Sequence, residues 1–152
     1  MLTVQNLTSY YSNIKILKDL TFSLQKGKVT CLLGRNGAGK TTFFNLLSGF
    51  MTPDDGDIRF KGQRLNGMRP SNICKLGMTR TFQIVKPFPE LSVLENVMIG
   101  AFNSTASTAK AREIAYRVLE LVEYAEYAEY PAGALPVAGR KRIEVAKALA
   151  TK

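Results

Sequence analysis

The run at residues 34–41, GRNGAGKT, constrains this chain more than any other part of its sequence. It matches the pattern G-x-x-x-x-G-K-[ST], whose glycines let the backbone turn tightly, so that successive N–H groups face inward around an anion. A helix that begins directly after such a loop adds its positive N-terminal dipole at the same point. The motif therefore predicts a cradle for the phosphates of a nucleotide.

The segments on either side of the motif fit the strand and helix that a phosphate-binding loop requires. Residues 29–33 are a short apolar run that opens with two β-branched residues, which is typical of a buried strand. Residues 42–48 carry apolar side chains at helical spacing, and Gly49 is a suitable C-terminal stop. The order of strand, loop and helix is the one that phosphate binding needs.

Residues of the loop have separate expected roles. We expect Lys40 to reach the β- and γ-phosphates as a point charge, and the Thr41 hydroxyl to ligate the Mg²⁺ that neutralises them. The predicted contacts to the nucleotide come from Gly34, Asn36, Gly37, Ala38, Gly39, Lys40, Thr41 and Thr42.

The composition indicates a globular domain of ordinary size, since 45% of the 152 residues are hydrophobic and 22% are charged. Apolar runs fall short of the roughly 18 residues that span a bilayer, and the N-terminus lacks a signal-peptide layout, so we expect a cytoplasmic chain. Cys31 and Cys74 have neither metal-ligand nor disulfide-framework spacing, and both are expected to be buried packing residues. The absence of histidine excludes histidine-based chemistry within these residues.

The net charge of +9 raises the possibility of nucleic-acid binding, which clustered Lys and Arg would support. However, only residues 140–142 form a basic triplet, and no RNA-binding aromatic motif or zinc-finger spacing accompanies it. We therefore expect no nucleic-acid partner. The charge fits a solvated basic surface, and proximity to an anionic membrane leaflet stays open.

Residue periodicity outlines the rest of the chain. It predicts strands at residues 2–7, 21–24, 57–61 and 78–83. The prolines within residues 86–89 predict an irregular segment and a boundary, and Ser92 with Glu95 predicts a capping box for a short helix. Further helices are predicted at residues 109–123 and 141–150, whereas residues 124–130, which repeat a three-residue unit, are read as a helix end or loop.

With these features in place, the whole chain resembles the nucleotide-binding subunit of ABC transporters. The resemblance implies an α/β fold: a P-loop NTPase (RecA-like) core with N-terminal antiparallel strands and a helical subdomain, the C-terminal part of the core missing. It implies three parts: a nucleotide-binding core at residues 1–83, a Q-loop and helical subdomain at 84–139, and the helix after the signature loop at 140–152.

The resemblance adds two site residues outside the phosphate loop. Tyr11 stands where the family has an aromatic ring that stacks on adenine, although Ser12 replaces the usual glycine. Gln83 matches the Q-loop glutamine, which is implied to sense Mg²⁺ or the attacking water. Lys40 and Gln83 are thus the candidate catalytic residues, with Thr41 and Gln83 at the metal.

The amino-acid sequence at residues 80–83 and 88–91 resembles that of the subgroup that serves branched-chain amino-acid importers. This implies ATP and Mg²⁺ as cofactors, and location at the cytoplasmic face of the inner or plasma membrane. The implied partners are membrane-spanning permease subunits, a second ATPase subunit that completes a nucleotide sandwich, and, indirectly, a periplasmic binding protein. Importers for other amino acids, urea and amides belong to the same subgroup, so the substrate rests on analogy.

The family's signature loop is where the sequence departs from the pattern. Its flanks align on Leu135 and on residues 140–143, but Pro136 stands at the serine, Val137 and Ala138 at the glycines, and Gly139 at the glutamine. The serine hydroxyl that meets a γ-phosphate is missing, so backbone amides at the following helix N-terminus are the expected anion contact.

The resemblance also implies a later aspartate, a catalytic glutamate and a loop histidine, which this sequence does not contain. We therefore expect an N-terminal fragment that binds nucleotide at most, without appreciable turnover, and whose exposed sheet edge favours association. Two other classes stay open. A non-transport ABC ATPase would show a coiled-coil insertion or tandem units, and a binding-only regulatory module would lack the downstream acidic pair.

Overall fold

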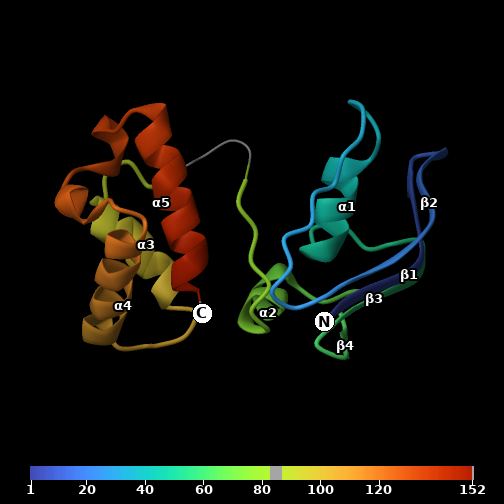
Figure 1. Cartoon of the computed structure of the whole chain (residues 1–152), viewed down its shortest axis with the longest axis horizontal. Helices are drawn as coiled ribbons and strands as arrows, with labels where there is room; N and C mark the ends of the chain where they lie inside the picture. The colour runs from blue at the N-terminus through green and yellow to red at the C-terminus, as the bar shows by residue number, and fades with distance from the viewer. Residues whose placement is uncertain (83–86, 152) are drawn as a thin grey trace. The chain divides into compact units, whose positions relative to one another are not determined.

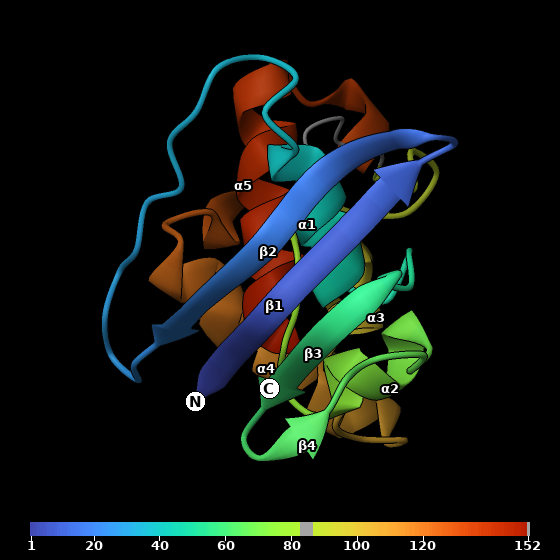
Figure 2. The ribbon, with the colours of Figure 1, turned by 90° about the vertical axis from the view of Figure 1, so that its right-hand side faces the viewer.

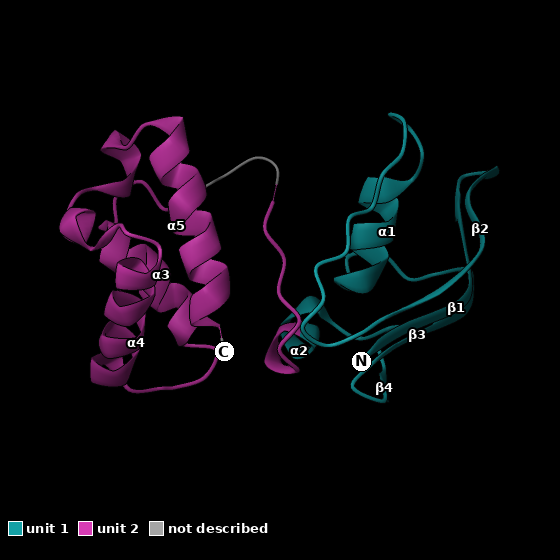
Figure 3. Cartoon of the chain, viewed as in Figure 1, with its two compact units in different colours: residues 1–73 teal, residues 74–152 magenta. Residues whose placement is uncertain are grey.

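The computed structural model describes residues 1–82 and 87–151. The chain divides into two compact units, Met1–Ile73 and Cys74–Lys152, which Figure 3 colours separately. Each is described by itself, and the predicted three-part division stays a prediction. Among the helices of the described residues, none combines the length and the apolar character needed to cross a membrane.

Unit 1 is built on a four-stranded sheet in the order β2-β1-β3-β4, with every neighbouring pair antiparallel. The strands are β1 (Leu2–Tyr11), β2 (Ile14–Leu24), β3 (Asp55–Phe60) and β4 (Gln63–Arg64), and Figure 2 shows them from the open side of the sheet. The antiparallel N-terminal strands expected from the sequence are confirmed. They are longer than predicted, because β1 and β2 continue to a shared turn.

The core of unit 1 lies between one face of this sheet and helix α1 (Lys40–Leu47) (Figures 1 and 2). Val4 is paired with Phe22 on one side and Ile58 on the other, so the register brings apolar side chains to the same face. Phe43 of α1 packs edge-on against Phe22, with ring centroids 5.4 Å apart. Burial of one helix face against one sheet face therefore places the start of α1 over the sheet.

Helix α1 ends as the sequence predicts. Gly49 adopts a φ of +74°, and its N–H donates to the Leu46 carbonyl at 3.3 Å. The Phe50 N–H donates to the Asn45 carbonyl at 2.9 Å, which completes a Schellman motif. A side chain at position 49 would also meet the Met68 carbonyl, so glycine is required there for conformation and for space.

Two predicted strands are wrong in the described residues. Residues 29–33 pair with no described strand, and Val29 and Leu33 are 103% and 85% exposed. The apolar run has strand propensity, but a strand forms only where a neighbour completes its hydrogen-bond ladder. Residues 78–82 also carry no strand, and Gln83, the last residue of that prediction, lies outside the described residues.

Unit 2 is helical. Helix α2 (Pro70–Lys75) spans the division between the units, and α3 (Val93–Ala101), α4 (Thr108–Leu121) and α5 (Val137–Ala150) follow, with the short 3-10 turns η1 (Ala125–Tyr127) and η2 (Ala132–Ala134). The predicted helix at residues 141–150 begins four residues earlier, at Val137, because Pro136 is compatible with the N-cap position.

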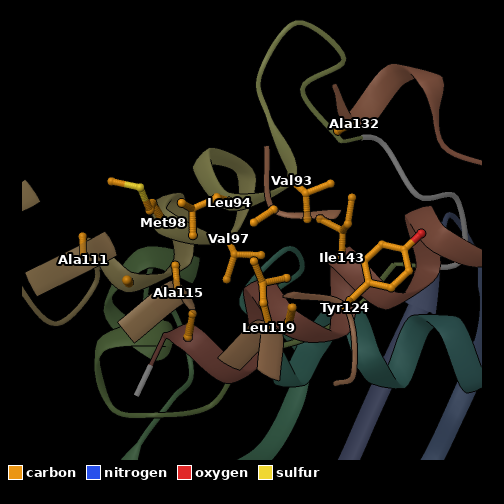
Figure 4. Packing of buried hydrophobic residues seen from close by; sticks show 14 of the residues in the cluster. Val93, Leu94, Val97, Met98, Ala111, Ala115, Leu119, Tyr124, Ala132 and Ile143 are labelled. Atoms are coloured by element: carbon orange, nitrogen blue, oxygen red, sulfur yellow. The ribbon is translucent and has the colours of Figure 1, made fainter. Parts of the chain in front are cut away.

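Helices α3, α4 and α5 share one core, part of which is drawn in Figure 4. Gly100 lets α3 approach α5 closely, since a Cβ there would collide with the Lys147 carbonyl. The capping box predicted before α3 is confirmed: Ser92 Oγ accepts from the Glu95 N–H at 3.1 Å, and Glu95 accepts from the Ser92 N–H at 2.8 Å. The buried hydrophobic members of this core are Val93, Leu94, Val97, Met98, Ala101, Ala111, Ala115, Leu119, Tyr124, Ala128, Ala132, Leu135, Ile143, Ala146 and Ala150.

Ser9 gives a test of the unit 1 core. Its side chain is fully buried, and its hydroxyl has no hydrogen-bond partner among the described residues. Ser9→Ala is expected to raise the free energy of unfolding by up to about 1 kcal/mol, because it removes a desolvated polar atom without removing a bond. Urea unfolding measures the change. Ser23→Ala, on the exposed side of β2, is the control and should stay within about 0.5 kcal/mol of the parent. A clear loss of stability on Ser9→Ala would contradict this reading.

Candidate nucleotide-binding site

The loop before α1 adopts a conformation that only glycine accommodates easily at two positions. Gly37 and Gly39 have φ values of +82° and +81°, in the left-handed region. Gly39 is the N-cap of α1, and the Phe43 N–H donates to its carbonyl at 2.8 Å. The Ala38 N–H donates to the Arg35 carbonyl at 3.2 Å, which closes the turn in between. The loop thus feeds directly into the positive end of a helix.

Lys40, the first residue of α1, reaches back across this loop. Its Nζ donates to the carbonyl oxygens of Gly34 at 2.6 Å and Arg35 at 2.8 Å. The first turn of α1 contains no acidic residue, and Gly39 provides no side-chain cap. An ammonium group and a positive helix end therefore meet without a protein carboxylate in that turn, which suits a polyanion.

The phosphate loop is seated on strand β2. A Cβ on Gly39 would lie 2.9 Å from Leu17 Cδ2 and 3.0 Å from Ile16 Cγ2, so the glycine backbone touches the strand. Gly37, in contrast, has nothing within 4 Å of a Cβ built in the same way. The glycines of the motif thus do different things: Gly39 permits close packing and a left-handed turn, whereas Gly37 permits only the turn.

Tyr11 lies at the end of the hairpin that carries this seat. It pairs with Ile14 across the turn, and its side chain is 71% exposed. Ile14 precedes Ile16 by two positions, so Tyr11 is offset from the seat of Gly39 by about 6.5 Å along the strand direction. Ser12 has a φ of +54°, the left-handed region that glycine adopts more easily, so serine holds the family's glycine position at some cost in strain.

The other predicted site residues differ in their exposure to solvent. Thr41 is exposed and Thr42 half-buried in the first turn of α1, while Gly34, Asn36 and Ala38 are exposed in the loop. The described residues hold no group of three or more His, Cys, Asp or Glu side chains able to bind a metal ion.

The cysteine prediction is wrong. Cys31 is exposed and Cys74 is half-buried. Cys31 belongs to residues 29–33, so it loses its expected burial together with the expected strand.

The signature loop, residues 135–139, contains the N-terminus of α5. Pro136 is the N-cap and offers no side-chain hydrogen bond, and the Arg140 N–H donates to its carbonyl at 3.1 Å. Val137 and Ala138 are exposed, whereas Gly139 is buried against the Tyr124 hydroxyl. A side chain at position 139 would collide with that hydroxyl, which explains why glycine suits this position here.

The sequence did not predict that Tyr124 and Arg142 pack around the start of α5. The Arg142 guanidinium lies 5.6 Å from the Tyr124 ring centroid and donates to the Glu123 carbonyl at 3.1 Å. Burial raises the pKa of the Tyr124 hydroxyl, with Tyr127 adding to the effect and Arg142 opposing it. The three-residue repeat at 124–130 could have given a signal, since 3-10 geometry stacks residues three apart and the Tyr124 and Tyr127 rings lie 4.5 Å apart.

The fold and the loop define a nucleotide-binding protein of the P-loop class, and comparison with known proteins identifies the family. The ABC transporter family matches residues 17–152. The chain is 34% identical to a probable branched-chain amino acid transport ATP-binding protein, LivG, of Archaeoglobus fulgidus, over 98% of this chain and 63% of that protein. It is 32% identical to the high-affinity branched-chain amino acid transport ATP-binding protein BraF of Pseudomonas aeruginosa, over 100% of this chain and 66% of that protein.

Among solved structures, the chain resembles the ADP conformation of an ATP-binding cassette of an ABC transporter, with a TM-score of 0.87 and 30% identity, over 99% of this chain and 65% of that one. The chain therefore belongs to the ABC transporter family, as an ATP-binding subunit related to those of branched-chain amino-acid importers. The expected P-loop NTPase fold is confirmed. The chain spans between 63% and 66% of the length of the branched-chain relatives that it matches.

Gly39 and Gly37 make a matched pair for testing the loop. Gly39→Ala is expected to lower the free energy of unfolding by about 2 kcal/mol or more, because left-handed strain adds to the contact with Leu17. Gly37→Ala should cost only the strain, about 1 kcal/mol, since space is open there. Urea unfolding of both variants measures the difference. Equal losses in the two variants would show that the contact between position 39 and β2 does not contribute to the free energy of unfolding.

Proposed function

We propose that this chain is the ATP-binding subunit of an ABC importer that couples ATP binding and hydrolysis to the uptake of branched-chain or related amino acids. The observation that carries the proposal is the phosphate loop, which packs on β2 at Gly39 and is spanned by the hydrogen bond from Lys40 Nζ to the Gly34 carbonyl. The chain that holds this loop belongs to the ABC transporter family. Because the chain spans less than two thirds of its relatives, activity, substrate and partners are proposed for the whole protein.

The loop residues fit a nucleotide triphosphate with Mg²⁺. Lys40 can exchange its bonds to the Gly34 and Arg35 carbonyls for bonds to β- and γ-phosphate oxygens. Backbone amides of the loop would bind the same anion. Thr41 would hold Mg²⁺, which supplies neutralisation of the phosphate charge, and Tyr11 would stack on adenine. Asn36, Ala38 and Thr42 line the same loop and first turn.

Three roles in this proposal rest on the family resemblance. Gln83 would sense Mg²⁺ or the attacking water, and Lys40 would stabilise the charge on the γ-phosphate during in-line attack. The first turn of α5 would meet the nucleotide held by a second ATPase subunit. Because Pro136 supplies no hydroxyl, that contact would come from the backbone amides of residues 137–139.

The proposed partners are membrane-spanning permease subunits, the second ATPase subunit and, indirectly, a periplasmic binding protein. The proposed location is the cytoplasmic face of the membrane, as a peripheral subunit. Two of the similar proteins are named as branched-chain amino acid transport ATP-binding proteins, which supports import of these substrates.

Sugar import is a second candidate, because a ribose import ATP-binding protein of Shouchella clausii is 33% identical over 97% of this chain. The chain covers 31% of that protein and 63% of the Archaeoglobus relative.

Lys40→Ala tests nucleotide binding. The variant is expected to bind ATP at least about 100-fold more weakly, because a hydrogen-bonded positive charge on the phosphates is lost. Equilibrium binding of a fluorescent ATP analogue measures it. Lys26→Ala, an exposed lysine in the turn after β2, is the control and should bind normally. Binding that survives in Lys40→Ala would refute the proposed site.

The same protein preparation tests turnover. We expect the pure 152-residue chain to bind ATP weakly and to release no appreciable phosphate, since the sequence contains no histidine for the family's loop position. Phosphate release that disappears in Lys40→Ala would contradict this expectation.

Tyr11→Ala tests the adenine contact. It should weaken ATP binding about fivefold or more, because stacking on an aromatic ring contributes about 1–3 kcal/mol per base. Tyr11→Phe keeps the ring and should bind like the parent. Tyr10→Ala is the neighbouring control, since the Tyr10 ring is covered by Lys15 Nζ at 5.4 Å. A uniform loss in all three variants would point to damage of the hairpin instead of stacking.

A further inference from the structure

Asn6 and Asp19, one in each strand of the β1–β2 hairpin, adopt a left-handed backbone conformation. Their φ values are +50° and +47°. The pairing of the two strands shifts at both places: β1 has one extra residue where Asn6 lies, and β2 has one extra residue where Asp19 lies. An extra left-handed residue is typical of a β-bulge, and Asn and Asp adopt this conformation more easily than other residues with a side chain.

Each bulge is bonded to a threonine of the opposite strand. The Asn6 N–H donates to Thr21 Oγ1 at 2.8 Å, and the Thr21 hydroxyl donates to Asn6 Oδ1 at 3.0 Å. The Asp19 N–H donates to Thr8 Oγ1 at 3.2 Å, and the Thr8 hydroxyl donates to Asp19 Oδ1 at 3.3 Å. Each hydroxyl thus serves an amide that the bulge takes out of the ladder, and the two pairs have the same chemistry on opposite strands.

The two bulges decide which face of the hairpin meets α1. Val4 pairs with Phe22, and five positions further along either strand Ser9 pairs with Leu17. In a regular strand, five positions would reverse the face. Phe22 nevertheless packs on Phe43 of α1, and Leu17 contacts the N-cap of α1, so both face the helix. One extra residue on each strand therefore keeps Leu17 on the helix side while the strands stay paired.

A third bulge forms the surface on which the phosphate loop packs. β2 has a further extra residue, Ile16, directly before Leu17. Ile16 Cγ2 and Leu17 Cδ2 lie 3.0 and 2.9 Å from a Cβ built on Gly39. Adjacent residues of a regular strand would point to opposite faces, so the bulge allows both side chains to meet the same glycine. The place of this surface depends on the bulges that set the face of β2.

We propose that Asn6 and Asp19, bonded to their threonine partners, are positioning residues for the nucleotide, because they keep Leu17 on the side of the phosphate loop. The proposal rests on the proposed function, since it concerns the same loop. Neither residue needs to contact the nucleotide. A hairpin without the two bulges could pair at the same ends, but it would turn Lys18, instead of Leu17, toward the helix.

The ATP affinity of folded variants tests the role of Asp19. Asp19→Ala should weaken ATP binding about fivefold, because alanine makes no bond to Thr8 and is strained at a left-handed φ. Asp19→Asn keeps an acceptor oxygen and should bind like the parent. Ile58→Val removes a methyl group from the buried core of the same sheet. It is the control for lost stability and should also bind like the parent.

Deletion of Asp19 separates the face of β2 from the contact with Thr8. Without this residue, Leu20, Lys18 and Leu17 follow one another in regular alternation, so Leu17 stays on the helix side although the bond to Thr8 is gone. The deletion variant should therefore bind ATP more tightly than Asp19→Ala, and within about threefold of the parent. Binding as weak as in Asp19→Ala overturns the proposal. Parent-like binding in Asp19→Ala, or an equal loss in Ile58→Val, overturns it as well.

Amide hydrogen exchange in the 152-residue chain tests the bulge without nucleotide. Thr8→Val should speed exchange at Asp19 about tenfold, because the acceptor of its N–H is lost, whereas Thr8→Ser keeps the hydroxyl and the protection. Thr3→Val, in the same strand, is the control and should leave this amide unchanged. Parent-like exchange in Thr8→Val overturns the proposal.

If Asp19→Ala does not fold, the deletion of Asp19 and Thr8→Val decide. A parent that binds no ATP overturns the proposed function instead, and the exchange measurements still decide whether Thr8 holds the bulge.

Discussion

The contact between Gly39 and strand β2 is the constraint on which the candidate site depends. The left-handed glycine lets the chain turn into α1, and its missing side chain lets that turn rest on Ile16 and Leu17. One contact therefore fixes three things together: the positive end of a helix, the lysine that follows it, and the hairpin that ends at Tyr11. Any larger residue at position 39 would separate the phosphate loop from the sheet that supports it.

Unit 2 depends in a similar way on close approaches to α5. Gly100 brings α3 against the Lys147 carbonyl, and Gly139 admits the Tyr124 hydroxyl. The second contact gives a physical reason for part of the altered signature loop: the space for a family glutamine at position 139 is taken by a tyrosine ring. Arg142, stacked on that ring, holds the end of α4 and the start of α5 together.

Local rules predicted the elements whose determinants are close in sequence. The capping box at Ser92 and the helix stop at Gly49 each depend on residues within a few positions of one another. The same rules failed for residues 29–33 and for Cys31, because burial of a strand depends on neighbours that its own sequence does not describe. They also missed Tyr124, whose role depends on a helix fifteen residues away.

The sequence by itself determined that a phosphate loop precedes a helix and that Lys40 begins that helix, because glycine conformation and helix polarity are local properties of the chain. Only the tertiary structure decided where the loop rests on β2, that the supporting hairpin ends at Tyr11, and that α3 and α5 meet at Gly100. These depend on strand register and on helix crossings, which arise when distant apolar faces are buried together.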